Sequence, residues 1–442
     1  MRRLLITLSL LALVAAACTT DEGATTTSAA PSTSTTVTAT TTTAGTTTTA
    51  TTAPLDPEGF YLMLMWHQHQ PLYPKDADGV VTRPWVRVHA TKDYYDMAAL
   101  VEEYPNVRVT FNLTPVLLLQ LEELANGTKD VYWVLSEVPA AALTADQKQF
   151  IRDRFFDANS QVIASFPRYQ ELRAGRAGDY TEQDWRDLQV LFNLAWTDPD
   201  FLAQEPLASL VAKGRDFTEE DKATLFAEHL RIIREVIPLH ARLWQQGNIE
   251  VTTTPLAHPI LPLIADTSAA STGDPSAILP ANRFNEVADA QEQVRRGLDT
   301  AERLLGARPV GMWPGEGAVD QYVIPMFSGN GVQWVATGED VLAPSLGLGS
   351  FSRDENDVVQ EADLLYRPWL GVPKRNAPVA IFFRDRLISD LVGFQYSGTP
   401  ADQAADDFMG RLQAIKDRLA AEGATGPHVV SEIGRASCRE RV

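Results

Sequence analysis

Cysteine is nearly absent from this sequence of 442 residues, which has only Cys18 and Cys438. We therefore expect no disulfide framework and a fold that depends on a buried apolar core. Basic residues are scarce relative to acidic ones, 38 against 57, which gives a formal net charge of −19. A chain of this charge repels phosphate backbones and anionic membrane surfaces. Nucleic acid is therefore not an expected partner, whereas a neutral ligand is compatible with the charge.

The N-terminal apolar run is shorter than the roughly 20 residues that cross a bilayer. It covers residues 4–17 and follows Arg2 and Arg3, which predicts an export signal over residues 1–17. The run ends in Ala15-Ala16-Ala17-Cys18, which resembles a bacterial lipobox except that Ala15 stands where Leu is usual. We expect Cys18 to be lipidated and the protein to be an exported cell-envelope lipoprotein with no other membrane contact. Plain secretion is the alternative.

Apolar residues are also scarce in residues 18–55, where Thr dominates and Ala, Ser and Pro occupy most other positions. Such a segment cannot bury a core, so it is predicted to be an extended tether. At the other end, residues 432–442 resemble the in-frame translation of a sequencing-library adapter. We expect them to be a non-native tail that forms no packed element, with a natural basic tail as the alternative. The folded unit is therefore predicted to span residues 56–431.

Apolar runs of strand length alternate with helical patterns inside this unit. Buried strands are predicted at residues 59–66, 107–112, 249–253, 309–313, 333–337 and 379–383. Between about 130 and 243 the pattern is helical, with helices at 147–156, 182–196 and 219–239 and with Thr181 and Thr218 as N-caps. The alternation predicts an α/β fold, a parallel barrel with a helical insertion at about 130–243.

Polar side chains follow most of these strands, and a parallel barrel gathers such strand ends around one pocket. The residues in question are His67, His69, Glu250, His258, Trp313, Glu316, Arg384, Asp385 and Asp390. Two carboxylates among histidine and aromatic rings suit glycoside cleavage, in which one carboxylate stays ionised and the other keeps a proton. Any one of these residues alone is more often a helix cap or a solvated turn, so the prediction depends on their combination.

Four ordered motifs resemble those of glycoside hydrolase family 57, which includes α-amylases, amylopullulanases and 4-α-glucanotransferases. They are His69-Gln70-Pro71, the stretch from 247–252 to His258-Pro259, residues 311–317 and residues 383–394. The similarity runs from about residue 60 to 430, and the helical insertion is similar to that of the amylopullulanase-like branch. The resemblance implies a (β/α)7 TIM-like barrel and a retaining mechanism on α-glucans, with no metal or cofactor. A fifth motif should follow residues 428–430 and is missing, so the barrel is predicted to be incomplete and truncated at its C-terminus.

The resemblance also implies roles for individual residues. Glu316 matches the family's nucleophile. The fourth motif offers two aspartates for the acid/base, and Asp390 is the better match because Phe394 follows it by four residues, as in the family. Asp385, beside Arg384, is then a positioning residue, although the opposite assignment stays open. The expected substrate contacts are His67, His69, Gln70, Glu250, His258, Trp313, Arg384 and Asp385.

Three other functions remain as alternatives. One is a 4-α-glucanotransferase of the same family, and another is a lipid-anchored glucan-binding protein that has lost catalysis. The third is a zinc hydrolase, since His67 and His69 are spaced to share a metal. That function needs further ligands at later strand ends, and of the seven histidines only His258 is placed to serve.

Overall fold

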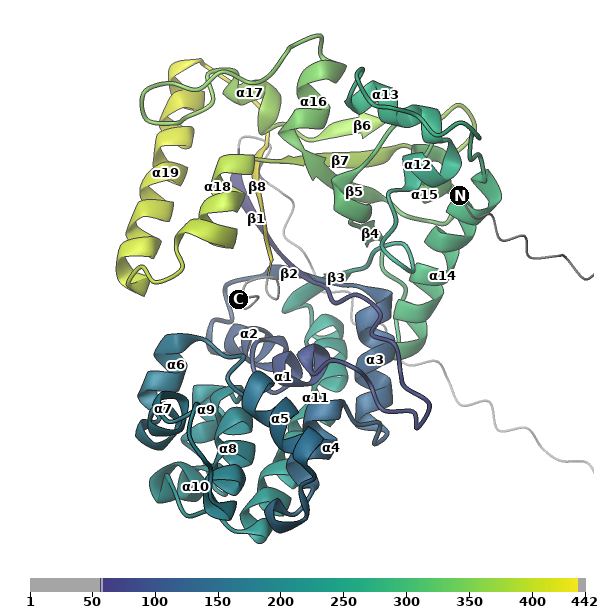
Figure 1. Cartoon of the computed structure of the whole chain (residues 1–442). Helices are drawn as coiled ribbons and strands as arrows, with labels where there is room; N and C mark the ends of the chain where they lie inside the picture. The colour runs from purple at the N-terminus through teal and green to yellow at the C-terminus, as the bar shows by residue number, and fades with distance from the viewer. Residues whose placement is uncertain (1–55, 57–58, 436–442) are drawn as a thin grey trace, which may run out of the picture. The chain divides into compact units, whose positions relative to one another are not determined.

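The computed structural model describes Asp56 and residues 59–435 (Figure 1). The predicted export signal, Cys18 and the tether lie outside the described residues, as do residues 436–442 of the predicted tail. Within the described part of the chain, no helix is long and apolar enough to cross a membrane.

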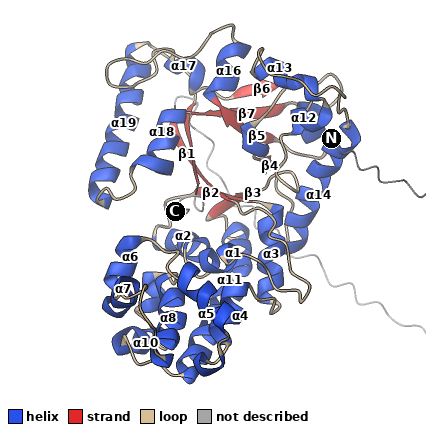
Figure 2. Cartoon of the chain, in the orientation of Figure 1, coloured by secondary structure: helices blue, strands red, loops and turns tan. Residues whose placement is uncertain are grey.

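Seven parallel strands form the central sheet of the described residues, in the order β3-β2-β1-β8-β7-β5-β4 (Figure 2). Their bounds are β1 (Phe60–Gln68), β2 (Val109–Leu113), β3 (Ile249–Thr252), β4 (Gly311–Met312), β5 (Trp334–Gly338), β7 (Val379–Arg384) and β8 (His428–Arg435). The two outer strands meet through a parallel bridge between Thr253 and Met312, where the Trp313 N–H donates to the Thr253 carbonyl oxygen at 2.9 Å. This bridge nearly closes the sheet into a barrel and confirms the predicted (β/α)7 fold. A short strand, β6 (Trp369–Gly371), adds to β7 in the antiparallel sense.

The strand β8 corrects one expectation, because residues 432–435 were predicted to form no packed element. They continue β8 and pair with β1, with Leu64 opposite Glu432 and Met65 opposite Ile433. Ile433 is 3% exposed and packs against Met65 and Trp313 inside the barrel. The alternation of strand side chains thus buries Ile433 on the same face as its apolar neighbours, and the strand expected to be missing is present.

Helices cover the strands and form the insertion. Between β1 and β2 lie α1 (Trp85–Ala90), α2 (Asp93–Ala99) and η1 (Leu100–Glu103). Between β2 and β3 lie α3 (Pro115–Ala125), α4 (Val131–Glu137), η2 (Ala140–Ala142), α5 (Ala145–Arg154), α6 (Ser160–Ser165), α7 (Pro167–Ala174), α8 (Glu182–Ala195), α9 (Pro199–Leu202), α10 (Leu207–Lys213) and α11 (Glu219–Gln245). Between β3 and β4 lie α12 (Leu261–Ala265), η3 (Thr267–Ala269), α13 (Ala270–Gly273) and α14 (Val287–Leu305). After β4 come η4 (Gly315–Gly317), α15 (Ile324–Gly329), α16 (Glu339–Ser345), α17 (Ala362–Leu365), α18 (Arg386–Asp390), η5 (Leu391–Gln395) and α19 (Ala401–Ala421).

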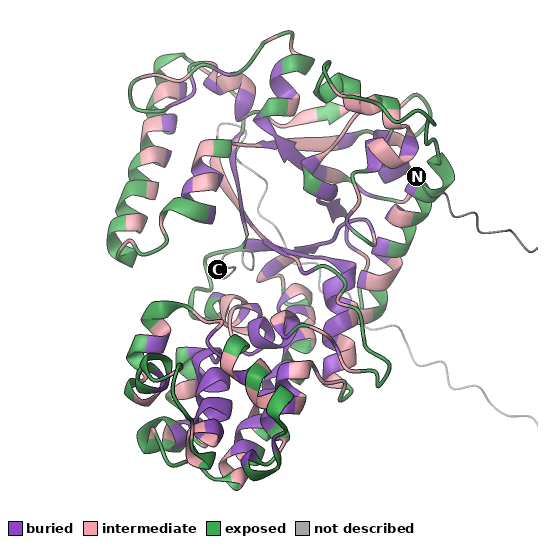
Figure 3. Ribbon diagram, viewed as in Figure 1, coloured by how far each residue is buried: buried purple, intermediate pink, exposed green. Residues whose placement is uncertain are grey.

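The helical insertion begins its main helices where the sequence predicts. The side chains of Thr181 and Thr218 each accept a hydrogen bond from the backbone N–H three residues on. The aspartate at that position accepts the backbone N–H of the threonine in turn, which makes two capping boxes. The insertion has its own apolar core, contributed by α1 and by helices α4–α11 and including Phe192 and Trp196. Figure 3 shows this core and the barrel strands mostly in the colour of buried residues. Through this core the insertion packs against α1, in the segment after β1.

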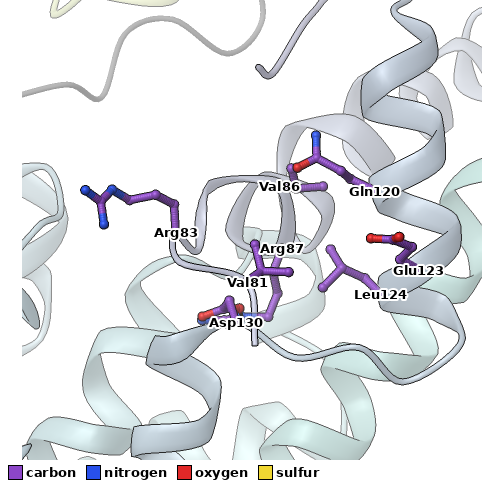
Figure 4. Close-up of a pocket in the computed structure, with 8 residues that line it drawn as sticks. All are labelled: Val81, Arg83, Val86, Arg87, Gln120, Glu123, Leu124 and Asp130. Carbon is purple, nitrogen blue, oxygen red and sulfur yellow. Dashed lines mark hydrogen bonds and ion pairs between the residues drawn. The ribbon is translucent and has the colours of Figure 1, made fainter. Parts of the chain in front are cut away.

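One small pocket in this region is structural (Figure 4). Arg87 and Asp130, both about 1% exposed, form an ion pair at 2.5 Å across it, and Arg87 also donates to Asn193 at 2.8 Å. The cavity encloses only about 10 Å³, room for about one water molecule. Its lining comes from the loop before α1, from α1, from α3 and from Asp130 at the start of α4, and it contains no predicted catalytic residue.

Candidate active site

His67 stands near the end of β1 and is oriented by the neighbouring strand. Its Nδ1 lies 2.6 Å from the Asn112 side-chain oxygen on β2. The Asn112 amide group donates to Thr252 Oγ1 at 2.8 Å and to the Thr253 carbonyl at 2.9 Å, which fixes its oxygen toward His67. An amide oxygen only accepts, so His67 Nδ1 carries a proton and donates it, and in the neutral ring Nε2 carries the lone pair.

Three histidines meet at this end of the barrel. The rings of His67 and His258 are stacked with centroids 5.0 Å apart, and those of His69 and His258 lie 4.5 Å apart. Trp313, 6% exposed, completes the group at 6.2 Å from His67. One nitrogen from each histidine lies within 4.8 Å of the others. The structure therefore brings together four of the predicted site residues, His67, His69, His258 and Trp313.

Glu316 presents its carboxylate at the edge of this group, on the turn η4. Its side chain is about 50% exposed, while Gly315 and Gly317 on either side are buried. One carboxylate oxygen lies 3.4 Å from His258 Nε2, and the Glu316 backbone N–H lies 3.4 Å from the same nitrogen. His258 Nε2 can donate to this carboxylate or accept from this backbone N–H, but one tautomer cannot do both.

Backbone strain is concentrated at this contact. Among the described residues only four other than glycine have positive φ, and His258 at 55° and Glu316 at 54° are two of them. Left-handed backbone costs about 1 kcal/mol or more in such residues and persists where the surroundings enforce it, which is typical of functional sites. Close packing at Gly315 holds the two loops in this conformation, because a Cβ there would lie 2.1 Å from the Pro259 carbonyl oxygen. The two loops are thus packed backbone to backbone.

Asp385 lies apart from the histidines, in a buried ionic network. It is 1% exposed, pairs with Arg353 at 3.0 Å, and accepts a hydrogen bond from the Tyr366 hydroxyl at 2.7 Å. Its Oδ1 also accepts from the Ile388 N–H, so it caps α18. The carboxylates of Asp385 and Glu339 raise the pKa of Arg353 against the effect of burial. All these contacts hold α18 in place.

Asp390 is the last residue of α18 and is half-buried. The preceding residue, Ser389, accepts the backbone N–H of Ile433 at 3.2 Å, and Ile433 packs against Trp313. This links the end of α18, through β8, to the side of the barrel where Trp313 and the histidines lie. Arg384 ends β7 opposite Gly338. Burial raises the pKa of Glu432 to about 8, and the positive charge of Arg384 opposes this rise.

Two predicted substrate contacts lie elsewhere. Glu250 is on β3 two residues before Thr252, so it sits one layer deeper in the barrel than the His67 ring. Burial raises the pKa of Glu250, while a hydrogen bond of 2.9 Å from Trp334 Nε1 opposes that rise. Gln70 donates to Tyr94 and accepts from Tyr73, which fixes the loop after β1. The structure does not bring either side chain to Glu316.

Sequence reasoning overlooked Asn112 as a site residue, although it ends a predicted strand as the chosen residues do. Arg353 was overlooked too, because it lies in a loop with no local pattern. Its role is evident only from its contacts with Asp385 and Glu339.

A parallel barrel that gathers an exposed carboxylate and three imidazoles at the carboxyl ends of its strands has the architecture of a barrel enzyme. The sequence model of glycosyl hydrolase family 57 matches residues 63–430, and the chain belongs to this family.

Several solved structures are similar. A GH57 branching enzyme from Thermococcus kodakaraensis is 15% identical with a TM-score of 0.44, over 85% of this chain and 64% of that one. A GH57-type branching enzyme from Pyrococcus horikoshii is 13% identical with a TM-score of 0.44, over 85% and 63%. The α-amylase AmyC from Thermotoga maritima is 12% identical with a TM-score of 0.43, over 85% and 67%. The chain thus spans just under two thirds of the length of the two branching enzymes. No curated protein matches it.

Proposed function

We propose that this protein is a retaining glycoside hydrolase that cleaves α-glucans, with Glu316 as nucleophile and Asp390 as acid/base. The observation that carries the proposal is the half-exposed Glu316 carboxylate, held on a strained turn against His258 at the mouth of the barrel. A nucleophile needs an accessible, ionised carboxylate in a fixed position, and this is the best-placed one near the histidines. The family membership and the acidic character of the chain, which suits a neutral substrate, support it further.

In the proposed reaction, Glu316 attacks the anomeric carbon of the sugar while Asp390 gives its proton to the departing glycosidic oxygen. A glycosyl ester on Glu316 results. Asp390 then takes a proton from water, whose oxygen attacks the anomeric carbon from the face opposite Glu316. The ester bond breaks, Glu316 leaves as a carboxylate, and the original configuration is restored. His67, His69 and His258 would hydrogen-bond the sugar hydroxyls, and Trp313 would pack beside the ring.

The bond cleaved and the acceptor used are tested by the products. We expect maltoheptaose to give shorter oligosaccharides with new reducing ends, as a hydrolase does. Products longer than maltoheptaose, with no gain in reducing ends, would indicate the alternative 4-α-glucanotransferase, and no turnover despite measurable glucan affinity would indicate a binding protein. Pullulan, which contains α-1,6 bonds, distinguishes the two linkage types.

The residue roles are tested with azide as an external nucleophile. Glu316→Ala leaves a space on the β face, so azide should yield a β-glycosyl azide from an activated α-glycoside. Asp390→Ala still forms the glycosyl ester, so azide should yield the α-glycosyl azide. If Asp385→Ala gives the α product and Asp390→Ala does not, the two aspartates exchange roles.

A zinc hydrolase is the second candidate, and one observation favours it. The nitrogens of His67, His69 and His258 lie within 4.8 Å of one another, and the hydrogen bond from His67 Nδ1 to Asn112 would orient Nε2 toward a metal. Metal analysis of the purified protein distinguishes a zinc hydrolase from the metal-free mechanism. Stoichiometric zinc that is lost in His69→Ala would support this candidate over the metal-free mechanism.

A further inference from the structure

A hollow of about 570 Å³ lies between a segment that follows His258 in the chain and a segment that follows Glu316. Its walls come from α12, η3 and α13, from the chain between α13 and the start of α14, and from α15 with the chain that leads into it. Figure 1 shows these helices next to one another on the side of the sheet where β4 lies. The volume is within the range of about 300–1,000 Å³ that small-molecule sites occupy.

The hollow begins where the two active-site loops separate. The contact of Gly315 with the Pro259 carbonyl oxygen locks the loops together at the active site. From there one chain runs on to α12 and the other to Tyr322, which both line the hollow. Tyr322 lies six positions after Glu316 in the chain, so the two Cα atoms are at most about 20 Å apart. A linear oligosaccharide is long enough to span this distance.

Tyr322 lines the hollow and is 70% exposed. It is presented by a turn in which Asp320 Oδ1 accepts the backbone N–H groups of Tyr322 at 2.8 Å and Val323 at 3.0 Å. Val287, 44% exposed, lies on the opposite element and adds to the apolar lining. The exposed face of this aromatic ring is available to stack on a ligand.

Polar groups line the same hollow. Arg283 and Asp266 form a two-pronged ion pair across the loop, with Arg283 Nε donating to Asp266 Oδ1 at 2.7 Å. Hydrogen bonds from Arg283 and Ser268 keep the pKa of Asp266 below its ordinary value, so it is an ionised acceptor at neutral pH. Asn285 adds an amide. An aromatic face bordered by a carboxylate, a guanidinium and an amide offers stacking together with donors and acceptors for hydroxyl groups, and this combination fits a sugar ring.

We propose that this hollow is a distal subsite for the same α-glucan chain that Glu316 cleaves, with Tyr322 as the stacking platform for a sugar unit away from the scissile bond. The inference rests on the proposed function. It makes Tyr322 a determinant of chain-length preference, because only a substrate long enough to reach the hollow gains the contact.

The test compares Tyr322→Ala with the wild type on maltotriose and on maltoheptaose. We expect kcat/KM on maltoheptaose to fall about tenfold, the loss of one aromatic contact, with little change on maltotriose. Tyr322→Trp keeps a stacking surface and should restore the preference. Tyr104→Ala, which removes a tyrosine that is 56% exposed outside the hollow, is the matched control and should change neither value.

A binding measurement separates failure of this inference from failure of the proposed function. Calorimetric titration of maltoheptaose into the protein should show Kd rising about tenfold in Tyr322→Ala, whether or not the chain turns the sugar over. Wild-type protein that fails to cleave any α-glucan refutes the proposed function, and the binding comparison then decides the subsite alone. Equal Kd values, or equal losses on short and long substrates, would overturn the subsite.

Discussion

Gly315 is the position at which the smallest change should have the largest effect on the site. Its φ is not in the left-handed region, so the backbone itself accepts alanine. The obstacle is steric, because the added Cβ would lie 2.1 Å from the Pro259 carbonyl oxygen and 2.8 Å from the His258 carbonyl oxygen. Both are backbone atoms, which cannot rotate away as a side chain would. Gly315→Ala must therefore push the two loops apart.

The size of the displacement follows from the contact. Normal Cβ contacts do not fall below 3.0 Å, so the loops must separate by about 1 Å. A shift of about 1 Å in a catalytic group can lower the rate about 100-fold, and overpacking against fixed atoms costs about 3 kcal/mol. We expect kcat/KM on maltoheptaose to fall about 100-fold and Tm to fall on the order of 5 °C.

The matched control is Gly410→Ala in α19, where a Cβ meets nothing within 4 Å. This variant should keep wild-type kcat/KM and gain up to about 1 kcal/mol of stability from helix propensity. Kinetics are measured well below the Tm of each variant, so that unfolding does not imitate a catalytic loss. Wild-type kcat/KM and Tm in Gly315→Ala would refute the argument that this backbone contact positions Glu316.

Three further predictions concern two charged side-chain clusters and metal removal. Asp385→Asn removes a charge from the buried pair with Arg353 and should lower the free energy of unfolding by about 3 kcal/mol in urea, whereas Asp390→Asn should abolish turnover and leave the urea midpoint nearly unchanged. The opposite pattern would make Asp385 the catalytic residue. Burial and the charges of Asp198 and Asp200 raise the pKa of Asp96 from 3.8 to about 6, so folding loses stability as pH rises from about 4 through 6. Asp96→Asn should therefore be more stable than wild type at pH 8 by about 1 kcal/mol, discounted for partial exposure, and no more stable at pH 3.5; an equal gain at both pH values contradicts this. Prolonged EDTA dialysis should leave turnover intact, and a loss that Zn²⁺ restores would favour the zinc candidate.

Local signals account for what could be predicted about the fold. Thr181 and Thr218 mark helix starts because a side-chain cap depends only on residues within one turn. The strands could be predicted from apolar runs, since strands of a parallel barrel are buried on both faces. The end of α11 could not be predicted in this way, because the helix continues past Pro238 to Gln245. Burial of His240 and Leu243 there outweighs the backbone hydrogen bond that Pro238 cannot donate.

Only the site residues that lie at the ends of strands could be predicted to come together. His67, His258 and Glu316 lie where barrel geometry gathers them, so their convergence followed from the strand pattern alone. The depth of Glu250 depends on register, and register is set by pairing with β2, which no local pattern encodes. The burial of Asp385 depends on Arg353, 32 residues earlier in the chain. Contacts of that kind become visible only in three dimensions.

The position of β8 between β1 and β7 has a consequence for the way the chain folds during synthesis. Phe60 at the start of β1 pairs with His428, so one edge of the first strand waits for a partner made about 370 residues later. At about 5–20 residues per second, that edge stays open for roughly 20 to 70 s on each ribosome. The helical insertion, with its own apolar core, can fold in that interval, but the barrel cannot close around the site. Closure of the barrel is thus a late and long-range event, and the nascent chain needs protection from edge-to-edge association until β8 arrives.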